Sequence, residues 1–254
     1  MESPLLGVRN LSVSFGKAKA VNNVSFDLNQ GQVLGIVGES GSGKSMTAMS
    51  LIGLLPEVRD IQSSGEIQYT ASNGIQSNLA ALSVKALNKI RGNEISMIFQ
   101  EPMTSFGPMH TFGNQIAEVL TLSNKLKKSE ARHRAVESLR SVGMPRPEKV
   151  FNQYPHQISG GMRQRAMIAM ALICNPEILI ADEPTTALDV STEAQILDIL
   201  AERQKTLNTS VLHISHNLGV VANIADEVLV MYLGQIVEYA PVYELFDDPK
   251  HPYT

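Results

Sequence analysis

The feature that most constrains this chain is a short glycine-rich turn between an apolar run and a segment of helical spacing. Residues 38–45 read GESGSGKS, follow Gln32–Val37, and lead into apolar residues at helical spacing from Lys44 to Leu54. The turn matches G-x-x-x-x-G-K-[ST], which is specific when a strand precedes it and a helix follows. Its glycines let backbone N–H groups turn inward, and the helix N-terminus attracts anions. We therefore expect a loop that holds a phosphate chain, not a surface linker.

The phosphate loop predicts a role for several of its side chains. Lys44 is expected to reach the β and γ oxygens of a nucleotide, and Ser45 is expected to ligate Mg²⁺. The residues expected to contact the nucleotide from this segment are Gly38, Glu39, Ser40, Gly41, Ser42, Gly43, Lys44, Ser45 and Met46.

Composition narrows the class of protein. With 254 residues and 43% hydrophobic content, the chain can bury a substantial core in one large domain or two small lobes. The net charge of −4, with scattered Lys and Arg, disfavours nucleic acid as a partner. The single cysteine, Cys174, excludes an internal disulfide. Because no apolar run approaches the ~20 residues that cross a bilayer, we expect any membrane role to depend on a partner.

The order of strand-like and helix-like segments predicts an α/β fold. Two β-rich segments, Val8–Phe15 and Val24–Leu28, flank an expected turn region at Gly16–Asn23 and predict a small antiparallel portion. Apolar spacing of three and four residues indicates an inserted helical lobe over residues 104–165. The final third alternates strand and helix, which is typical of a largely parallel sheet. Its expected elements are the strand Ile178–Ala181, the helix Thr192–Leu200 with a capping box of Thr192 and Gln195, and the strands Val211–Ile214 and Val228–Met231.

Two carboxylates follow the apolar segment Ile178–Ala181. At the C-terminal end of a strand, Asp182 can hold Mg²⁺ through a water molecule, and Glu183 can point toward an attacking water. Acidic residues after a strand often mark only a turn. The hypothesis therefore depends on their pairing with Lys44.

A second candidate anion site lies in the segment Ile158–Met162. Its central residues Ser159, Gly160 and Gly161 come at the start of an expected helix, and one nucleotide does not need two cradles. We therefore expect this segment to bind a nucleotide that another subunit holds. The segment resembles LSGGQ, the signature motif of the ATP-binding cassette (ABC) ATPases, with isoleucine and methionine as departures at its first and last positions.

Further positions match this family in order along nearly the whole chain. Phe15 resembles the aromatic residue that stacks on adenine, and Gln100 resembles the glutamine that senses Mg²⁺ and the γ-phosphate. Asp189, in Thr186–Asp189, resembles the intersubunit loop, and His216 resembles the switch histidine. Taken singly, each has a bland interpretation as a core, strand-end, helix-cap or turn residue. Their order and spacing together favour the family.

The resemblance implies a fold: an α/β P-loop NTPase (RecA-like) ABC nucleotide-binding domain with an N-terminal antiparallel β subdomain and an inserted helical subdomain. It implies one domain over residues 1–254. The antiparallel part is expected at about 1–34 and 60–75, the helical signature subdomain at about 103–165, and the RecA-like core in the remainder.

The implied chemistry is Mg²⁺-dependent ATP hydrolysis in a head-to-tail dimer, either of this chain with itself or with a homologous second ATPase. Each ATP would lie between the phosphate loop of one subunit and Ser159–Gly161 of the other. Glu183 would orient or deprotonate the water, and His216 would bridge to the γ-phosphate. The expected catalytic residues are Lys44, Gln100, Glu183 and His216, and the expected metal ligands are Ser45, Gln100 and Asp182.

Four longer segments resemble the dipeptide, oligopeptide and nickel importer branch of the family: Glu101–Pro108, Tyr154–Gln157, Ala181–Val190 and His251–Thr254. That branch couples to separate membrane permeases and receives its substrate from a binding protein. We therefore expect a peripheral subunit at the cytoplasmic face of the cell membrane. Because family members usually continue with a segment of cysteines that can carry an iron–sulfur cluster, the chain is also expected to be truncated or unusually short.

Two other functions share these motifs. A soluble ABC ATPase of translation or DNA maintenance normally has tandem cassettes or a long coiled-coil insertion, and the sequence shows neither. A nucleotide-dependent regulator without turnover is expected to lack the base or the switch residue, whereas Glu183 and His216 are both present. The motifs therefore favour the importer subunit.

Overall fold

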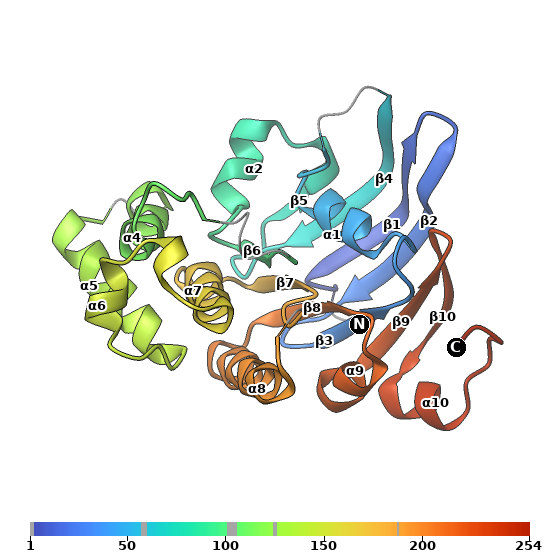
Figure 1. Ribbon diagram of the computed structural model, residues 1–254. Coiled ribbons are helices and arrows are strands. Elements are labelled where there is room, and N and C mark those ends of the chain that lie inside the picture. The colour runs from blue at the N-terminus through green and yellow to red at the C-terminus, as the bar shows by residue number, and fades with distance from the viewer. Residues whose placement is uncertain (1–2, 57–59, 101–105, 124–125, 187) are drawn as a thin grey trace.

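Two β-sheets and a lobe of helices make up the structure (Figure 1). The computed structural model describes residues 3–56, 60–100, 106–123, 126–186 and 188–254. Within these ranges, one sheet has four strands in the order β2-β1-β4-β5, and the other has six in the order β10-β9-β3-β8-β7-β6. None of the helices described is both long and apolar enough to span a membrane.

The four-stranded sheet is antiparallel. Its strands are β1 (Leu6–Phe15), β2 (Ala18–Leu28), β4 (Ile61–Thr70) and β5 (Gln76–Asn78), the last of which lies past the bound expected at residue 75. The turn predicted over Gly16–Asn23 is wrong in its extent: the turn covers only residues 16–17, because β2 already begins at Ala18. Val21 is fully buried and pairs with Val13, so its burial holds this segment in the sheet.

The six-stranded sheet consists of five parallel strands and one antiparallel edge strand, β10. Its strands are β3 (Val33–Val37), β6 (Ile95–Ile98), β7 (Ile178–Asp182), β8 (Ser210–Ser215), β9 (Glu227–Tyr232) and β10 (Gln235–Pro241). The three strands predicted in the final third of the chain are confirmed as β7, β8 and β9. They are almost continuously apolar because a parallel sheet is covered on both faces.

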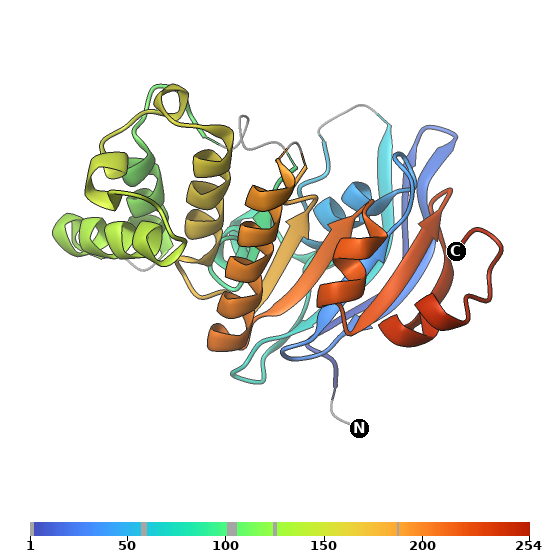
Figure 2. The same cartoon turned by 60° about the horizontal axis from the view of Figure 1, so that its bottom comes forward.

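Alternate residues of the parallel strands face two different cores. The helices around this sheet are α1 (Lys44–Leu51), α7 (Gly160–Leu172), α8 (Val190–Leu207), α9 (Leu218–Ile224) and α10 (Val242–Asp247). Ile178 and Ile180 of β7 belong to a core shared with α1 and the antiparallel sheet. Leu179 belongs to a core shared with α7 and α8. Figure 2 shows α8 and α9 in front of the parallel sheet. Because successive side chains of a strand point to opposite faces, a strand such as β7 contributes to the cores on both sides of the sheet.

Helix α8 begins earlier than the sequence predicted. The expected start was Thr192 with Gln195 in a capping box, but Asp189 is the N-cap, and its carboxylate accepts hydrogen bonds from Thr192 N (3.0 Å) and Thr192 Oγ1 (2.7 Å). Gln195 instead accepts a hydrogen bond from Arg165 of α7 at 2.7 Å. Because the aspartate satisfies an amide that lacks an intrahelical partner, the helix starts at Val190.

The helices between β6 and β7 form a lobe at the left of Figure 1. They are α4 (Phe112–Ser123), α5 (Lys128–Ser141), α6 (Pro147–Phe151) and α7, preceded by the 3₁₀ turn η2 (Pro155–Gln157). Phe112, Leu139 and Phe151 are buried in one apolar cluster with α7. The start predicted at residue 103 lies outside the described residues, and α7 runs to Leu172, beyond the predicted end. The 3₁₀ turn η1 (Leu79–Ala81) and helix α2 (Val84–Ile90) precede β6.

Candidate active site

The phosphate loop connects the end of β3 to the start of α1. Gly38, Gly41 and Gly43 all have positive φ angles, of 153°, 81° and 102°. A Cβ atom at Gly38 would lie 2.2 Å from the carbonyl oxygen of Met231, and one at Gly43 would lie 2.4 Å from that of Ala20. The loop therefore packs against β9 and β2 so closely that only glycine fits at these two positions. Of the other predicted contacts, Glu39 and Ser40 are exposed, Ser42 is buried, and Met46 packs against the main core.

Lys44 is folded back onto this loop. Its side chain is 5% exposed, and Nζ donates hydrogen bonds to the carbonyl oxygens of Gly38 (2.8 Å) and Glu39 (2.9 Å). Burial lowers the pKa of the Lys44 ammonium, while the nearby carboxylates of Glu183 and Asp182 raise it. The geometry holds a cation at the mouth of the loop, where it can meet phosphate oxygens.

The first turn of α1 touches the end of β7. Ser45 Oγ donates a hydrogen bond to Asp182 Oδ1 at 3.1 Å. Burial raises the pKa of the Asp182 carboxyl, the Ser45 hydrogen bond lowers it, Glu183 raises it and Lys44 lowers it. A hydroxyl and a carboxylate are the hard oxygen donors that suit Mg²⁺, which usually keeps waters and substrate phosphates as its other ligands. This donor set therefore fits a magnesium ion.

Glu183 follows β7 in an uncommon backbone conformation. Its φ angle is 46°, and its N–H donates to the carbonyl oxygen of Ile214 in β8 at 3.0 Å. Non-glycine residues adopt positive φ infrequently, and such positions cluster at active sites. The conformation aims a carboxylate toward the neighbouring strand ends while the backbone remains tied to β8.

Three side chains, two of them from distant parts of the chain, converge on this carboxylate. Gln100 Nε2 donates to Glu183 Oε2 at 3.1 Å, and His216 Nδ1 lies 3.1 Å from the same oxygen. Thr186 Oγ1 donates to it at 2.8 Å. The Glu183 side chain is 13% exposed, whereas that of His216 is 61% exposed. The structure thus brings together the predicted residues Gln100, Glu183 and His216, and adds Thr186, which was predicted only as part of the segment that resembles the intersubunit loop.

The segment Ser159–Gly161 belongs to the helical lobe. Ser159 is the N-cap of α7, and its hydroxyl accepts a hydrogen bond from Met162 N at 3.4 Å. A Cβ atom at Gly160 would meet nothing within 4 Å. Figure 1 places α7 with the helical lobe, apart from α1. The segment is an open helix N-terminus that could receive an anion from outside this chain.

Two other predicted residues have structural contacts of their own. Phe15 ends β1, pairs with Ala18, and packs half-buried against the main core. Asp189 caps α8, and hydrogen bonds from the side chain and backbone of Thr192 lower the pKa of its carboxyl. The interpretations of Phe15 as a core residue and of Asp189 as a helix cap therefore describe contacts that are present in the structure. Ala187, and Glu101–Ser105 of the longer segment matched above, lie outside the described residues.

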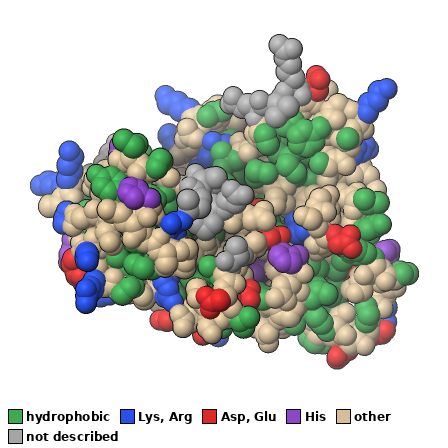
Figure 3. Space-filling model, in the orientation of Figure 1, with side chains coloured by type: hydrophobic (Ala, Val, Ile, Leu, Met, Phe, Trp, Pro, Cys, Tyr) green, Lys and Arg blue, Asp and Glu red, His purple; other side chains and the backbone are tan. Residues whose placement is uncertain are grey.

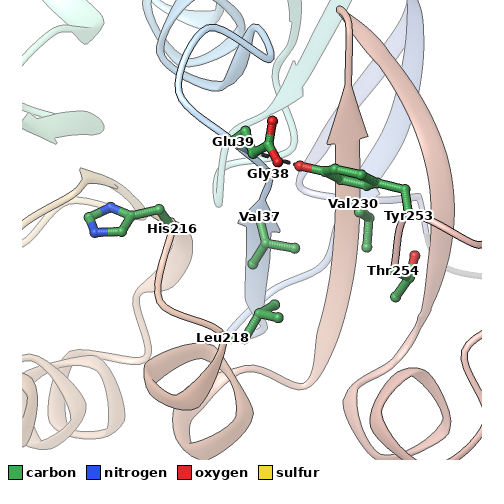
Figure 4. A pocket seen from close by; sticks show the side chains of 8 residues that line it. All are labelled: Val37, Gly38, Glu39, His216, Leu218, Val230, Tyr253 and Thr254. Atoms are coloured by element: carbon green, nitrogen blue, oxygen red, sulfur yellow. Dashed lines mark hydrogen bonds between the residues drawn. The ribbon is translucent and has the colours of Figure 1, made fainter.

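The C-terminal segment contacts the phosphate loop. Glu39 N donates a hydrogen bond to the Tyr253 hydroxyl at 2.9 Å, and the Tyr253 ring lies 4.5 Å from that of Tyr232. A cavity of about 270 Å³ lies between this contact and His216 (Figure 4). Beyond the presence of the motif His251–Thr254, no signal in the sequence predicted this contact.

The phosphate loop lies between a parallel strand and a helix, and its serine is hydrogen-bonded to a carboxylate from another strand of the same sheet. This arrangement defines a P-loop nucleoside triphosphatase. Comparison with protein families makes the class specific. The sequence model described as ABC transporter matches residues 21–186. The chain belongs to the ABC transporter family and is one of its ATP-binding ATPases.

Two relatives are similar over almost the whole chain. The oligopeptide transport ATP-binding protein OppD of Bacillus subtilis (strain 168) is 52% identical over 254 residues, which cover 98% of this chain and 70% of OppD. The dipeptide transport ATP-binding protein DppD of Lactococcus lactis subsp. cremoris (strain MG1363) is 54% identical over 258 residues, covering 100% of this chain and 72% of DppD.

Solved structures confirm the fold. A dimeric post-hydrolysis state of the ATP-binding cassette MJ0796, bound to ADP and Pi, has a TM-score of 0.79 and 27% identity, and covers 93% of this chain and 98% of its own. The cbiO1 protein from Clostridium perfringens, part of the ABC transporter complex cbiONQ, has a TM-score of 0.78 and 25% identity. The match covers 97% of this chain and 92% of the cbiO1 chain. The predicted fold class, a P-loop NTPase of the ABC type, is confirmed.

Proposed function

We propose that the chain is the ATP-hydrolysing subunit of an importer that carries oligopeptides or dipeptides through separate membrane permease subunits. The observation that supports hydrolysis is the convergence of Gln100, Thr186 and His216 on Glu183, beside the phosphate loop. The names of OppD and DppD, at 52% and 54% identity, support the peptide cargo. The peptide substrate itself would be selected by a binding protein and the permease.

The described residues suit the steps of hydrolysis. Lys44, already held at the loop, would stabilise charge on the β and γ oxygens of ATP. Glu183 would accept a proton from water as the water oxygen bonds to the γ-phosphorus. The bond from that phosphorus to the bridging oxygen breaks, which yields ADP and phosphate. His216, with a largely exposed imidazole, would donate to the γ-phosphate.

Mg²⁺ is the cofactor that the donor set fits. Ser45 would ligate it directly, Asp182 would hold it through water, and Gln100 would respond to it from the end of β6. When bound, Mg²⁺ supplies positive charge that neutralises the phosphates. The close approach of Ser45 and Asp182 supports this assignment, because both oxygens already lie at the loop.

A second cassette would complete each ATP site. Ser159, Gly160 and Gly161 form an unobstructed helix N-terminus that could receive the γ-phosphate of a nucleotide bound to the partner. Asp189, exposed at the start of α8, would contribute to the same interface. Phe15 would stack on the adenine. The partner would be a second copy of this chain or a homologous ATPase.

The cassette would work as a peripheral subunit at the cytoplasmic face of the membrane, docked on the permease. Nucleic acid is not among the proposed partners. On the face shown in Figure 3, Lys and Arg side chains lie scattered instead of forming one basic patch.

Reconstitution tests the proposed cargo. The chain would be coexpressed with the permease subunits encoded by neighbouring genes, purified as a complex, and placed in liposomes with ATP available to the cassette. We expect ATP-driven uptake of a labelled dipeptide or tripeptide, and none with Glu183→Gln. Uptake of Ni²⁺ without peptide, or a chain that binds no permease, would contradict the proposal.

A further inference from the structure

Thr186 makes two hydrogen bonds to Glu183. Its Oγ1 donates to Glu183 Oε2 at 2.8 Å, and its backbone N–H donates to the Glu183 carbonyl oxygen at 3.2 Å. The backbone bond spans three residues, so the pair closes a tight turn directly after β7. Since a glutamate side chain has several rotatable bonds, a donor attached to the same turn restricts its carboxylate without depending on any other element.

The other two neighbours of this carboxylate are attached elsewhere. Gln100 follows β6 and His216 follows β8, and in the proposed function both also turn toward ATP or Mg²⁺. Thr186 instead stands on the same turn as Glu183, at the start of the segment that resembles the intersubunit loop. All three contacts end on Oε2, and no residue in the described part of the chain donates a hydrogen bond to Glu183 Oε1. One oxygen is therefore anchored while the other is left to accept a proton.

We propose that Thr186 is a positioning residue for the general base. Its hydroxyl holds Glu183 Oε2 while Gln100 and His216 engage the nucleotide, so that Oε1 keeps a fixed place relative to the attacking water. The proposal rests on the proposed function, in which Glu183 is the base. A group held in its productive place before the reaction contributes to rate and not to affinity for ATP.

The neighbouring threonine provides a matched control within the same turn. Thr185 Oγ1 donates a hydrogen bond at 2.7 Å to Glu193 in the first turn of α8, and does not contact Glu183. Thr185→Val and Thr186→Val make the same chemical change one residue apart. A general disturbance of the turn would appear in both variants, whereas loss of base positioning would appear only in Thr186→Val.

The test measures steady-state ATP hydrolysis, ATP affinity and thermal unfolding of the purified chain. We expect Thr186→Val to lower kcat by about tenfold or more, with KM and ATP affinity within about twofold of the wild type. Thr186→Ser, which keeps the hydroxyl, should recover most of the rate, and Thr185→Val should match the wild type. If Thr186→Val does not fold, Thr186→Ala is expected to show the same loss of kcat.

Single-turnover measurements in the Glu183→Gln background separate positioning from a structural role. A residue that acts only through the base has nothing left to position, so adding Thr186→Val should cause no further loss. A further drop in this background, or a Thr186→Val rate equal to that of Thr185→Val, would overturn the proposal. If Glu183→Gln itself hydrolyses ATP at the wild-type rate, the base assignment of the proposed function fails instead.

Discussion

Ser45 Oγ lies 3.1 Å from Asp182 Oδ1, which joins the first turn of α1 to the C-terminal end of β7. The two residues are far apart in sequence, and the sheet order β3-β8-β7 brings them together. A serine hydroxyl and a carboxylate that meet beside the phosphate loop offer two oxygen donors of the kind that Mg²⁺ binds together with phosphates.

Replacing Asp182 with asparagine tests this proposed magnesium site. Loss of an outer-shell carboxylate typically weakens metal binding about 10–100-fold. Asp182→Asn should therefore raise the Mg²⁺ concentration that half-saturates ATP hydrolysis by that factor, as measured in a Mg²⁺ titration. Asp198→Asn, an exposed position on α8, is the control and should leave the titration unchanged. An unaltered Mg²⁺ requirement in Asp182→Asn would remove this residue from the metal site.

Phe15 allows the stacking role to be separated from the packing role. Base stacking on an aromatic ring contributes about 1–3 kcal/mol, so Phe15→Ala should weaken ATP binding roughly tenfold or more. Because Phe15 also packs against the main core, Phe15→Leu is the informative variant: it retains apolar bulk but lacks the aromatic face. Phe15→Tyr should bind ATP normally. Calorimetric titration that finds wild-type affinity for Phe15→Leu would leave Phe15 as a core residue only.

Local pattern was sufficient to predict the parts of the site that depend on neighbouring residues. The phosphate loop could be predicted because its glycines, lysine and serine stand at the spacing of the motif. The structure adds why Gly38 and Gly43 must be glycine, since a Cβ atom there would collide with Met231 or Ala20. Asp182 could be placed because an apolar run before it made β7 evident. The roles of these residues in catalysis stay predictions.

Other features of the site could not be predicted in the same way. Asp189 is the N-cap of α8 because its carboxylate could reach Thr192, although Thr192 with Gln195 also fitted a capping pattern. The hydrogen bond from Glu39 to Tyr253 depends on where the C-terminal segment folds back. The role proposed for Thr186 depends on the positive φ angle of Glu183, which cannot be predicted from the presence of a glutamate in the sequence.

His213 should make stability depend on pH. It is buried in β8, its Nε2 has no hydrogen-bond partner among the described residues, and burial lowers its pKa to about 4. Below pH about 6.5 His213 becomes protonated in the unfolded chain, whereas in the folded chain it stays neutral until pH about 4. The free energy of unfolding therefore keeps its full value above pH about 6.5 and falls by up to about 3 kcal/mol as the pH decreases toward about 4.

Denaturant unfolding between pH 4 and 7 measures this effect. His213→Phe removes the titrating group, and its side chain borders a cavity of about 130 Å³ that can accept the added atoms. The variant should therefore lose stability less steeply than the wild type in this interval. His133→Gln, at an exposed position on α5, should follow the wild-type curve. Parallel curves for His213→Phe and the wild type would contradict the assignment.

Gly160 tests the second cassette. In the Glu183→Gln background, ATP with Mg²⁺ should accumulate a dimer that light scattering detects, and ADP should not. Gly160→Asp should abolish that dimer, because a carboxylate opposite a γ-phosphate in a desolvated interface costs several kcal/mol. The monomer tolerates the change sterically, since a Cβ at Gly160 meets no atom within 4 Å, and ATP binding should persist. Ala80→Asp, an exposed site in η1, should still dimerise. If the Gly160→Asp variant still formed dimers with ATP, residues 159–161 would not belong to the shared site.

The proposed function depends above all on Glu183 as the base of a Mg²⁺-dependent ATPase whose nucleotide is held by the phosphate loop. Phosphate release and ATP binding, measured on the same samples of wild type and Glu183→Gln, test this role. The amide keeps the size of the side chain but cannot take up a proton from water. We predict turnover about 10²–10⁴-fold below that of the wild type, with ATP affinity retained. A Glu183→Gln variant that binds ATP and releases phosphate at a rate near the wild type would contradict the account.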